Sequence, residues 1–310
     1  MKASFLNGLV LALAPFAFTS GLVAQTVMID YNSESSISDN LTKGLMRATS
    51  GTGYESAGDL TYSAGSGLSG SGAAYAPSGF PDNLMYATKA TFDGGFTSAT
   101  FGTYVYTRAD VLTNQGGLAV SMGFVSLATP ESGNGTANTG SPAGVPTPTP
   151  LSASNQYSLA VSLRTSYDTE GNEVFGFNLY SNGALVGQTS SSETVLVTVG
   201  SWYYWEASVG HSGNDYTVTA SLYSSDGSGT IGGTALLTKS FSVENAELSA
   251  LEDIYGLLSG QNSGRRGIEY LDNTSYEVIP EVSQSSLIMG ALGMFALLAG
   301  LRRCRRGSKS

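Results

Sequence analysis

The amino-acid sequence predicts an all-β protein, a two-sheet antiparallel β-sandwich of the jelly-roll type. Short runs of alternating apolar and polar residues recur through residues 25–278, and Gly, Ser, Asn and Asp separate them. Glycine accounts for 40 of the 310 residues, and only 12% of the residues are charged. This composition is poor in helix-forming residues and rich in residues that favour strands and turns.

The overall composition excludes several classes of protein. A hydrophobic share of 41% is too high for a disordered chain. The formal net charge of −10 argues against nucleic acid as a partner, because a phosphate backbone requires a basic surface. With a single cysteine, Cys304, the chain has neither a disulfide scaffold nor a zinc site built from cysteines.

The strands are predicted from alternation, as in Leu159, Val161 and Leu163, where every second residue is apolar. One helix is predicted over Asn245–Leu258, with Leu248 and Leu251 on its apolar side. In chain order, the predicted strands are Val27–Tyr31, Leu84–Phe92, Phe101–Arg108, Leu118–Leu127, Tyr157–Ser166, Val174–Tyr180, Val195–Val199, Trp202–Val209, Tyr216–Tyr223, Leu236–Val243 and Ile268–Val278.

Residues 25–278 are interpreted as one domain. The Pro-rich segment near residues 129–150 is expected to be a long surface loop within it, the alternative being a linker between two domains. The first and last predicted strands stand at the two ends of this domain, as they do when terminal strands pair in a jelly roll. The sequence alone does not decide that pairing.

The two ends of the chain resemble targeting signals. Residues 1–24 are predicted to be a secretory signal peptide, with Lys2, an apolar stretch and a small residue, Ala24, at the cleavage point. Near the other end, Leu287–Leu301 is apolar throughout and is predicted to be a transmembrane helix that anchors the chain in the inner membrane. A basic cluster that would stay on the cytoplasmic side follows it, and consists of Arg302, Arg303, Arg305 and Arg306.

The short motif Ile279-Pro280-Glu281 precedes this apolar segment. A Pro-Glu motif, an apolar helix and an arginine-rich end in this order resemble the PEP-CTERM sorting signal over residues 279–310. Val282 departs from the pattern, because that family usually has a second proline there. The resemblance implies an exosortase-type enzyme as a partner, a Gram-negative bacterium that makes exopolysaccharide, and a final location at the cell surface or in the extracellular matrix.

A second resemblance covers the domain itself. The aromatic run Gly200–Glu206, the strand Tyr216–Tyr223 and the later Tyr270–Asn273 resemble the concanavalin A-like lectin/glucanase superfamily, which includes laminin-G-like domains. The resemblance implies a two-sheet jelly roll and, in many members, carbohydrate binding. Fold alone does not establish that function.

The candidate binding residues are aromatic. If Tyr203 and Trp205 face the core, then alternation turns Trp202, Tyr204 and Glu206 to the opposite face. Aromatic rings stack on sugars, while nearby polar groups bind hydroxyls. The alternative is that loops or a second sheet cover these rings as ordinary core. The full candidate set is Trp202, Tyr204, Glu206, Tyr104, Tyr106, Arg108 and Tyr180.

No catalytic residues are predicted. His211 is the only histidine and stands in a Gly/Ser/Asn-rich segment, so a Ser–His–Asp triad is not expected. Glycoside hydrolysis requires two carboxylates, and Glu206 is the best single candidate but has no partner on its strand. The chain is therefore expected not to be an enzyme, although a glycan-active hydrolase stays open as an alternative.

No cofactor is predicted, apart from a structural calcium ion. If the terminal strands pair, oxygens from Asp30, Asp272 and Asn273 could converge on Ca²⁺. The alternative is that these residues only cap turns. The leading hypothesis is an exported, non-catalytic carbohydrate-binding or adhesion module, and a purely structural matrix protein is the third possibility.

Overall fold

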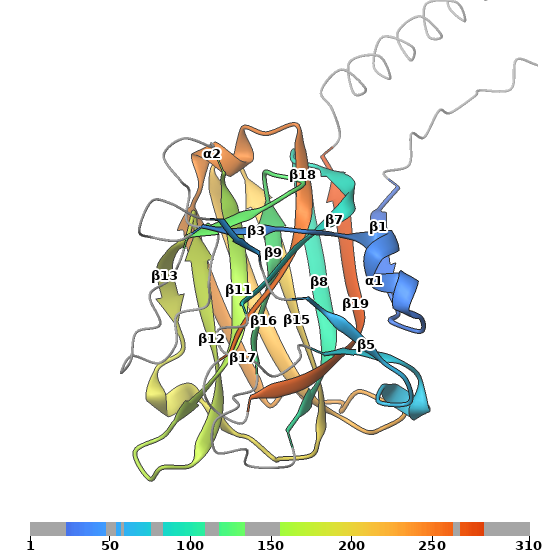
Figure 1. Ribbon diagram of the computed structural model, residues 1–310. Coiled ribbons are helices and arrows are strands. Elements are labelled where there is room, and N and C mark those ends of the chain that lie inside the picture. Colours follow the sequence, from blue (N-terminus) through green and yellow to red (C-terminus); the bar gives the residue numbers. More distant parts are fainter. Residues whose placement is uncertain are drawn as a thin grey trace, which may run out of the picture. The chain divides into compact units, whose positions relative to one another are not determined.

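The computed structural model describes residues 23–47, 54–56, 59–75, 83–108, 118–133, 156–262 and 267–281 (Figure 1). Within this part of the chain there are two α-helices, α1 (Glu34–Asn40) and α2 (Ala246–Ser249), and two 3₁₀ turns, η1 (Leu68–Gly70) and η2 (Ser191–Glu193). The strands are β1 (Gln25–Ile29), β2 (Leu41–Lys43), β3 (Leu45–Arg47), β4 (Tyr54–Ser56), β5 (Thr61–Ser63), β6 (Ala73–Tyr75), β7 (Asn83–Asp93), β8 (Phe96–Thr107), β9 (Leu118–Val125), β10 (Glu131–Gly133), β11 (Ser158–Tyr167), β12 (Glu173–Ser181), β13 (Ala184–Gln188), β14 (Val195–Leu196), β15 (Trp202–Ser212), β16 (Asp215–Ser225), β17 (Leu237–Glu244), β18 (Asp253–Asn262) and β19 (Ile268–Pro280).

The strands form two large antiparallel layers. The first, here called sheet I, has the order β17–β16–β15–β8–β19–β1, and the short strand β6 pairs with the beginning of β19. The second, sheet II, has the order β13–β12–β11–β9–β18–β7–β2. Among the described residues, Ile268 of β19 pairs with Leu118 of β9 and so connects the two sheets. A small third sheet consists of β10, β3 and β4.

One face of each sheet is apolar, and these two faces enclose the core. Trp205 of sheet I is fully buried, and its ring centroid lies 6.2 Å from that of Phe177 in sheet II. Phe175 of sheet II packs edge-on against Tyr203 of sheet I, with ring centroids 5.2 Å apart. The all-β, two-sheet antiparallel sandwich is therefore confirmed, because residues at every second position of both sheets share one core.

The terminal strands, whose pairing the sequence leaves open, are neighbours in sheet I. β1 runs antiparallel to β19, with Gln25 opposite Val278 and Ile29 opposite Thr274. β19 continues two residues beyond the predicted end of the domain, since Ile279 and Pro280 still pair with β8. The compact unit spans Ala24–Glu281.

The predicted helix over Asn245–Leu258 is wrong for most of its length. Only Ala246–Ser249 is helical, and its N-cap is Asn245, whose side chain accepts a hydrogen bond from the Leu248 amide. The residues that follow form β18, which lies between β9 and β7. Both faces of this central strand are covered, and a bulge between Tyr255 and Leu257 interrupts its alternation, so its apolar spacing is similar to that of a helix.

Several predictions lie outside the described residues. They are the signal peptide through residue 22, most of the Pro-rich loop, the apolar segment Leu287–Leu301 and the cluster Arg302, Arg303, Arg305 and Arg306. None of the helices within the described ranges is long and apolar enough to cross a bilayer. Of the sorting motif, Glu281 is held at the end of the sheet, where its amide donates to the Gly95 carbonyl over 2.8 Å.

Candidate functional site

The candidate site lies on the face of sheet I that points away from the core. Along β15, Tyr203 and Trp205 are buried, whereas Trp202, Tyr204 and Glu206 are partly exposed on the opposite face. A strand turns successive side chains to opposite faces, so the buried residues fix the direction of the exposed ones. Strand pairing then decides which side chains on neighbouring strands lie beside them.

Strand pairing places four aromatic residues in a line across four adjacent strands, here called the first row. Tyr75 of β6 is opposite Tyr270 of β19, Tyr270 is opposite Tyr106 of β8, and Tyr106 is opposite Trp202 of β15. The ring centroids of successive members lie 6.2, 5.9 and 5.3 Å apart. All four side chains are partly exposed.

A second row lies two residues away from the first on β8 and β15 and extends onto β16. Tyr104 of β8 is opposite Tyr204 of β15, which is opposite Tyr223 of β16. Their ring centroids are 4.8 and 6.4 Å apart. The two rows together form one partly exposed aromatic surface, here called the aromatic face, which extends over β6, β19, β8, β15 and β16.

Glu206 lies at the edge of the second row. Its carboxylate accepts hydrogen bonds from the hydroxyl of Tyr204 over 3.3 Å and from that of Tyr223 over 3.4 Å. Burial of Tyr204, together with the charge of Glu206, raises the pKa of this tyrosine well above its usual range. The Tyr204 hydroxyl therefore stays protonated at neutral pH and acts as a hydrogen-bond donor to Glu206.

Two loops border the aromatic face beside Tyr104. The Tyr104 hydroxyl donates to the carbonyl of Gly229 over 2.8 Å, and the Ser69 amide donates to that of Gly227 over 2.6 Å. Asp226 holds its own loop in shape, because one carboxylate oxygen accepts from the amides of Ser228 and Thr230. The aromatic face therefore has a wall on one side, built from residues 226–230 and η1.

On β16 and β17, small hydroxyl side chains lie on the same side of sheet I. Thr219 and Ser240 are hydrogen-bonded over 2.9 Å, and Ser221 and Thr238 over 3.1 Å. These four residues are here called the hydroxyl cluster.

The structure brings together six of the seven candidate residues and separates one. Trp202, Tyr204, Glu206, Tyr104 and Tyr106 belong to the two rows or their edge, and partly exposed Arg108 follows directly after β8. The inclusion of Tyr180 is a correction. It lies on β12 of sheet II, is 4% exposed and packs against Ala119, and the Asn178 amide donates to its hydroxyl over 3.2 Å.

Three residues of the aromatic face were missed from the sequence, namely Tyr75, Tyr223 and Tyr270. A signal existed for Tyr223, because Tyr216, Val218, Ala220 and Leu222 alternate into the core and leave Tyr223 outside. Tyr270 and Tyr75 join only through pairings with strands that are distant in sequence.

The proposed calcium ligands have other uses. Asp30 is exposed and accepts hydrogen bonds from Asn32 and Ser36. Asp272 is fully buried, and its carboxylate accepts from the Leu68 amide over 2.9 Å and from the Asn273 amide over 2.8 Å. Burial raises the pKa of Asp272.

The N–H donors around Asp272 compete with a cation for the same oxygens, so this arrangement fits a structural role better than a metal site. In the portion of the chain with described coordinates, no group of three acidic, histidine or cysteine side chains could hold a metal ion. Calcium binding stays a prediction.

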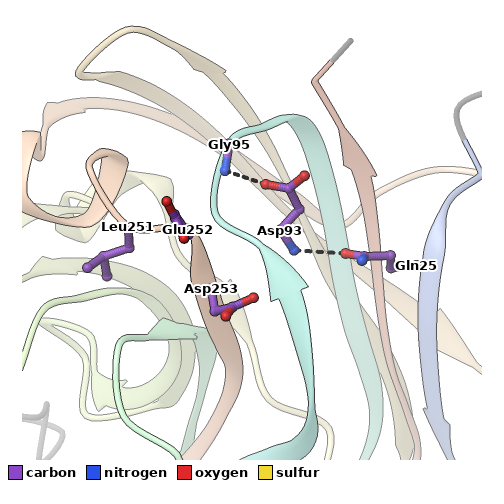
Figure 2. Close-up of a pocket in the computed structure, with 6 residues that line it drawn as sticks. All are labelled: Gln25, Asp93, Gly95, Leu251, Glu252 and Asp253. Carbon is purple, nitrogen blue, oxygen red and sulfur yellow. Dashed lines mark hydrogen bonds between the residues drawn. The ribbon is translucent and has the colours of Figure 1, made fainter. Parts of the chain in front are cut away.

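A cluster of carboxylates lies at the other end of β8. A cavity of about 470 Å³ is lined by Gln25, Asp93, Gly95, Leu251, Glu252 and Asp253 (Figure 2). Asp93 lies opposite Asp253 in the sheet, and its carboxylate accepts from the Gly95 amide over 2.9 Å.

This carboxylate cluster is too far from the aromatic face to act on a ligand there. Gly95 precedes β8, whereas Tyr104 is near its end, and a strand extends about 3.3 Å per residue, so the two regions are roughly 30 Å apart. Glu206 has Gly102 and Ser221 as its cross-strand neighbours, and neither carries a carboxylate.

His211 is the other residue considered for catalysis. It belongs to β15 rather than to a turn, stacks on Tyr216 with ring centroids 4.5 Å apart, and hydrogen-bonds through Nδ1 to the Phe96 carbonyl. These contacts give it a packing role.

Comparisons with known proteins give structural likeness only. Peanut lectin crystallised with a nonapeptide is 14% identical, with a TM-score of 0.49 over 82% of this chain and 97% of that chain. Lectin II from Ulex europaeus is 13% identical with a TM-score of 0.48, over 82% and 97%. The metal-free lectin I-B4 from Griffonia simplicifolia is 11% identical with a TM-score of 0.44, over 81% and 98%.

No family model matches the sequence, and no curated protein matches it either. Since these identities and TM-scores carry no conclusion about ligands, function has to follow from the residues of the aromatic face.

Proposed function

We propose that this chain is a carbohydrate-binding module that uses the aromatic face of sheet I. The observation that carries the proposal is the clustering of seven partly exposed aromatic rings on the outward side of one sheet. Rings of this kind present apolar surfaces on which the C–H faces of sugars pack, while hydroxyl and carboxylate groups at the ring edges bind sugar hydroxyls. Glu206 and the two tyrosine hydroxyls bonded to it supply such polar groups.

Affinity electrophoresis of the purified full-length chain in gels that contain polysaccharides tests this function. We expect retardation by at least one polymer and its loss on Trp202→Ala or Tyr204→Ala. Tyr167→Ala is the matched control, because Tyr167 is 52% exposed but belongs to sheet II. Retardation that survives both face substitutions, or no retardation by any polymer, would contradict the proposal and favour a structural matrix protein. Gels with calcium and with EDTA test the calcium prediction in parallel.

The proposed location is the cell surface or extracellular matrix of a Gram-negative bacterium, after export and after sorting by an exosortase-type enzyme. Its support is the order of the Ile279-Pro280-Glu281 motif, the apolar Leu287–Leu301 segment and the arginine-rich end. Mass spectrometry of the mature protein tests it, since processing should remove residues 1–24 and the segment after the motif. A mature chain that retains Leu287–Leu301 would contradict sorting.

A further inference from the structure

Asp272 is a fully buried aspartate on the same side of sheet I as the aromatic face. It lies opposite Tyr104 across β19 and β8. Its neighbour Leu271 belongs to the core, so alternation turns Asp272 outward. A carboxyl group is costly to bury unless hydrogen-bond donors surround it, so its donors show which part of the molecule this side chain holds.

Three donors converge on the Asp272 carboxylate, and two of them belong to η1 and the residue after it. Oδ2 accepts from the Leu68 amide over 2.9 Å and from the Ser71 hydroxyl over 3.3 Å. Oδ1 accepts from the amide of Asn273, the next residue in β19, over 2.8 Å. The first two bonds join segments that are distant in sequence, and they attach η1 to sheet I.

The backbone is unusual on both sides of this carboxylate. Ser69, within η1, has a φ of 53°, a left-handed conformation that is unfavourable for a residue with a side chain. Such a conformation persists where the surrounding contacts hold it. In β19, Asn273 has a φ of 46°, and a register shift between Asp272 and Ser275 marks a bulge, a feature that re-aims the side chains beside it. The strained turn and the bulge meet at the Asp272 carboxylate.

η1 in turn contacts the loop of residues 226–230. The Ser69 amide donates to the Gly227 carbonyl over 2.6 Å. The Leu68 side chain is 6% exposed and lies against the loop, since a Cβ atom built on Gly229 would be 3.2 Å from Leu68 Cδ1. The two segments that form the wall of the aromatic face are therefore attached to each other as well as to sheet I.

The wall ends on the aromatic face itself. The Gly229 carbonyl accepts the hydrogen bond from the Tyr104 hydroxyl over 2.8 Å, and the Tyr104 ring lies 4.8 Å from that of Tyr204. A continuous series of contacts thus runs from Asp272 through η1 and the loop to the second row of rings.

We infer that Asp272 is a positioning residue of the aromatic face, and this step rests on the proposed function. Its carboxylate attaches η1 to β19, η1 holds the loop of residues 226–230, and the loop fixes the ring of Tyr104. Asp272 is itself fully buried, so it acts without touching the glycan. When the wall is free to move, Tyr104 has to be ordered as the glycan binds, and that ordering lowers affinity.

Hydrogen exchange of the full-length chain without ligand, followed by mass spectrometry, tests the series of contacts. Asp272→Asn keeps the size of the side chain but replaces one acceptor oxygen by an NH₂ group, which faces an N–H donor whichever way the amide is turned. We expect the amides of residues 67–71 and 226–230 to exchange at least about fivefold faster, because a buried donor loses its acceptor.

Asn245→Ala is the matched control for hydrogen exchange. It removes buried hydrogen bonds beyond the end of β17, at the opposite end of the strands from Tyr223, and should leave exchange in both segments unchanged. Faster exchange in residues 67–71 alone would overturn the connection between η1 and the loop. Unchanged exchange in both segments would overturn the role of Asp272.

Affinity electrophoresis in gels that contain soluble glucomannan, xyloglucan, alginate or polygalacturonate measures the effect on binding. For the polymer that retards the unsubstituted chain, Asp272→Asn should lower affinity at least about threefold, the expected cost of ordering one side chain on binding. Asn245→Ala should leave the affinity unchanged although it also destabilises the fold. A general loss of stability would instead lower the affinity of both variants, and that result would overturn the positioning role.

Gly67→Ala is a second variant that leaves Asp272 in place. Its added Cβ atom would overlap the Gly72 carbonyl oxygen and lie 2.8 Å from Asp272 Oδ2, so η1 has to shift. It should reproduce both the faster exchange and the lower affinity, which keeps the inference testable if Asp272→Asn does not fold.

The outcomes separate this inference from the function on which it rests. Retardation that Trp202→Ala abolishes but that Asp272→Asn and Gly67→Ala leave unchanged would overturn the positioning role and leave carbohydrate binding intact. If no polymer retards the unsubstituted chain, or if retardation survives Trp202→Ala, the proposed function is contradicted and the positioning role in binding is overturned with it.

Discussion

Gly102 allows Tyr204 to occupy its position in the aromatic face, and replacing it with alanine tests that reasoning. Gly102 lies in β8 opposite Glu206. A Cβ atom built there would lie 2.6 Å from the Tyr204 hydroxyl oxygen and 2.9 Å from the Trp205 carbonyl oxygen. The first atom can move because it ends a side chain, but the second belongs to the backbone of a paired strand.

The expected change in the free energy of unfolding of Gly102→Ala is the sum of two opposing contributions. Overpacking in a tight site costs about 1–3 kcal/mol. Replacing glycine within a strand by alanine returns about 0.5–1 kcal/mol, because the unfolded chain loses conformational freedom. Gly102→Ala is therefore expected to destabilise the protein by roughly 0–2.5 kcal/mol. This variant should also weaken glycan binding, because the added methyl group displaces the Tyr204 hydroxyl from its position in the aromatic face.

Gly210→Ala is the matched control. Gly210 lies on the same outward side of sheet I, and the nearest atom to its added Cβ would be the Thr217 carbonyl oxygen at 3.9 Å, an ordinary contact. Since the glycine term is common to both variants, their difference isolates overpacking. Urea unfolding followed by tryptophan fluorescence should give Gly102→Ala the lower free energy of unfolding, by about 1–3 kcal/mol. Equal values for the two variants would refute the close contact.

Three further predictions concern stability. The pKa of Glu193 is lowered to about 2, chiefly by the hydrogen bond from Lys239, so this pair stabilises the fold above the ordinary carboxyl pKa of 4.5 and stops doing so as pH falls towards 2. An NMR titration of Glu193 should show this, and Lys239→Met should move the pKa upwards. Asn245→Ala should cost about 1–3 kcal/mol in urea, because it removes the cap on Leu248 and buried hydrogen bonds, whereas Asn245→Asp should retain the cap. Gly183→Ala should cost about 1–2 kcal/mol, since Gly183 has a φ of 80° in the β12–β13 turn, and an unchanged unfolding midpoint would contradict this.

The sequence predicted the strands that alternate cleanly between core and surface. In β15, the positions of Tyr203 and Trp205 in the core and of Trp202 and Tyr204 outside it followed from alternation alone. The turn at Asn182 and Gly183 also follows from residue type, because Asn-Gly is typical of a tight hairpin turn and both residues have positive φ. These features depend on local spacing, which a single sequence contains.

Features that depend on contacts distant in sequence could not be predicted. Tyr104 and Tyr204 are neighbours because β8 pairs with β15, and no local pattern specifies that pairing. β18 was misread because its residues are covered on both faces, so it lacks the period-2 signal of a half-exposed strand. The assignment of Tyr180 to the candidate site was wrong because the sequence does not show which sheet contains β12.

A structural explanation for the aromatic face competes with the functional one. Cross-strand aromatic pairs stabilise a sheet by about 0.2–1 kcal/mol each, so Tyr104 and Tyr204 could be present for stability alone. The hydroxyl cluster on β16 and β17 argues against this as a full account, because Thr219 and Ser240 occupy outward positions of the same sheet with small side chains. Packing of the core does not require either set of side chains, since both point away from it.

A double-mutant cycle on Tyr104 and Tyr204 separates the two explanations. If the rings serve stability, most of the free energy of unfolding lost in the single variants should appear as coupling free energy between Tyr104 and Tyr204. Both single variants should then retain any glycan affinity. If they serve binding, the coupling should stay within the ordinary range for a cross-strand pair, while each single substitution weakens the complex by more than the fold is weakened. The ratio between the loss in free energy of glycan binding and the loss in free energy of unfolding assigns the aromatic face to one role or the other.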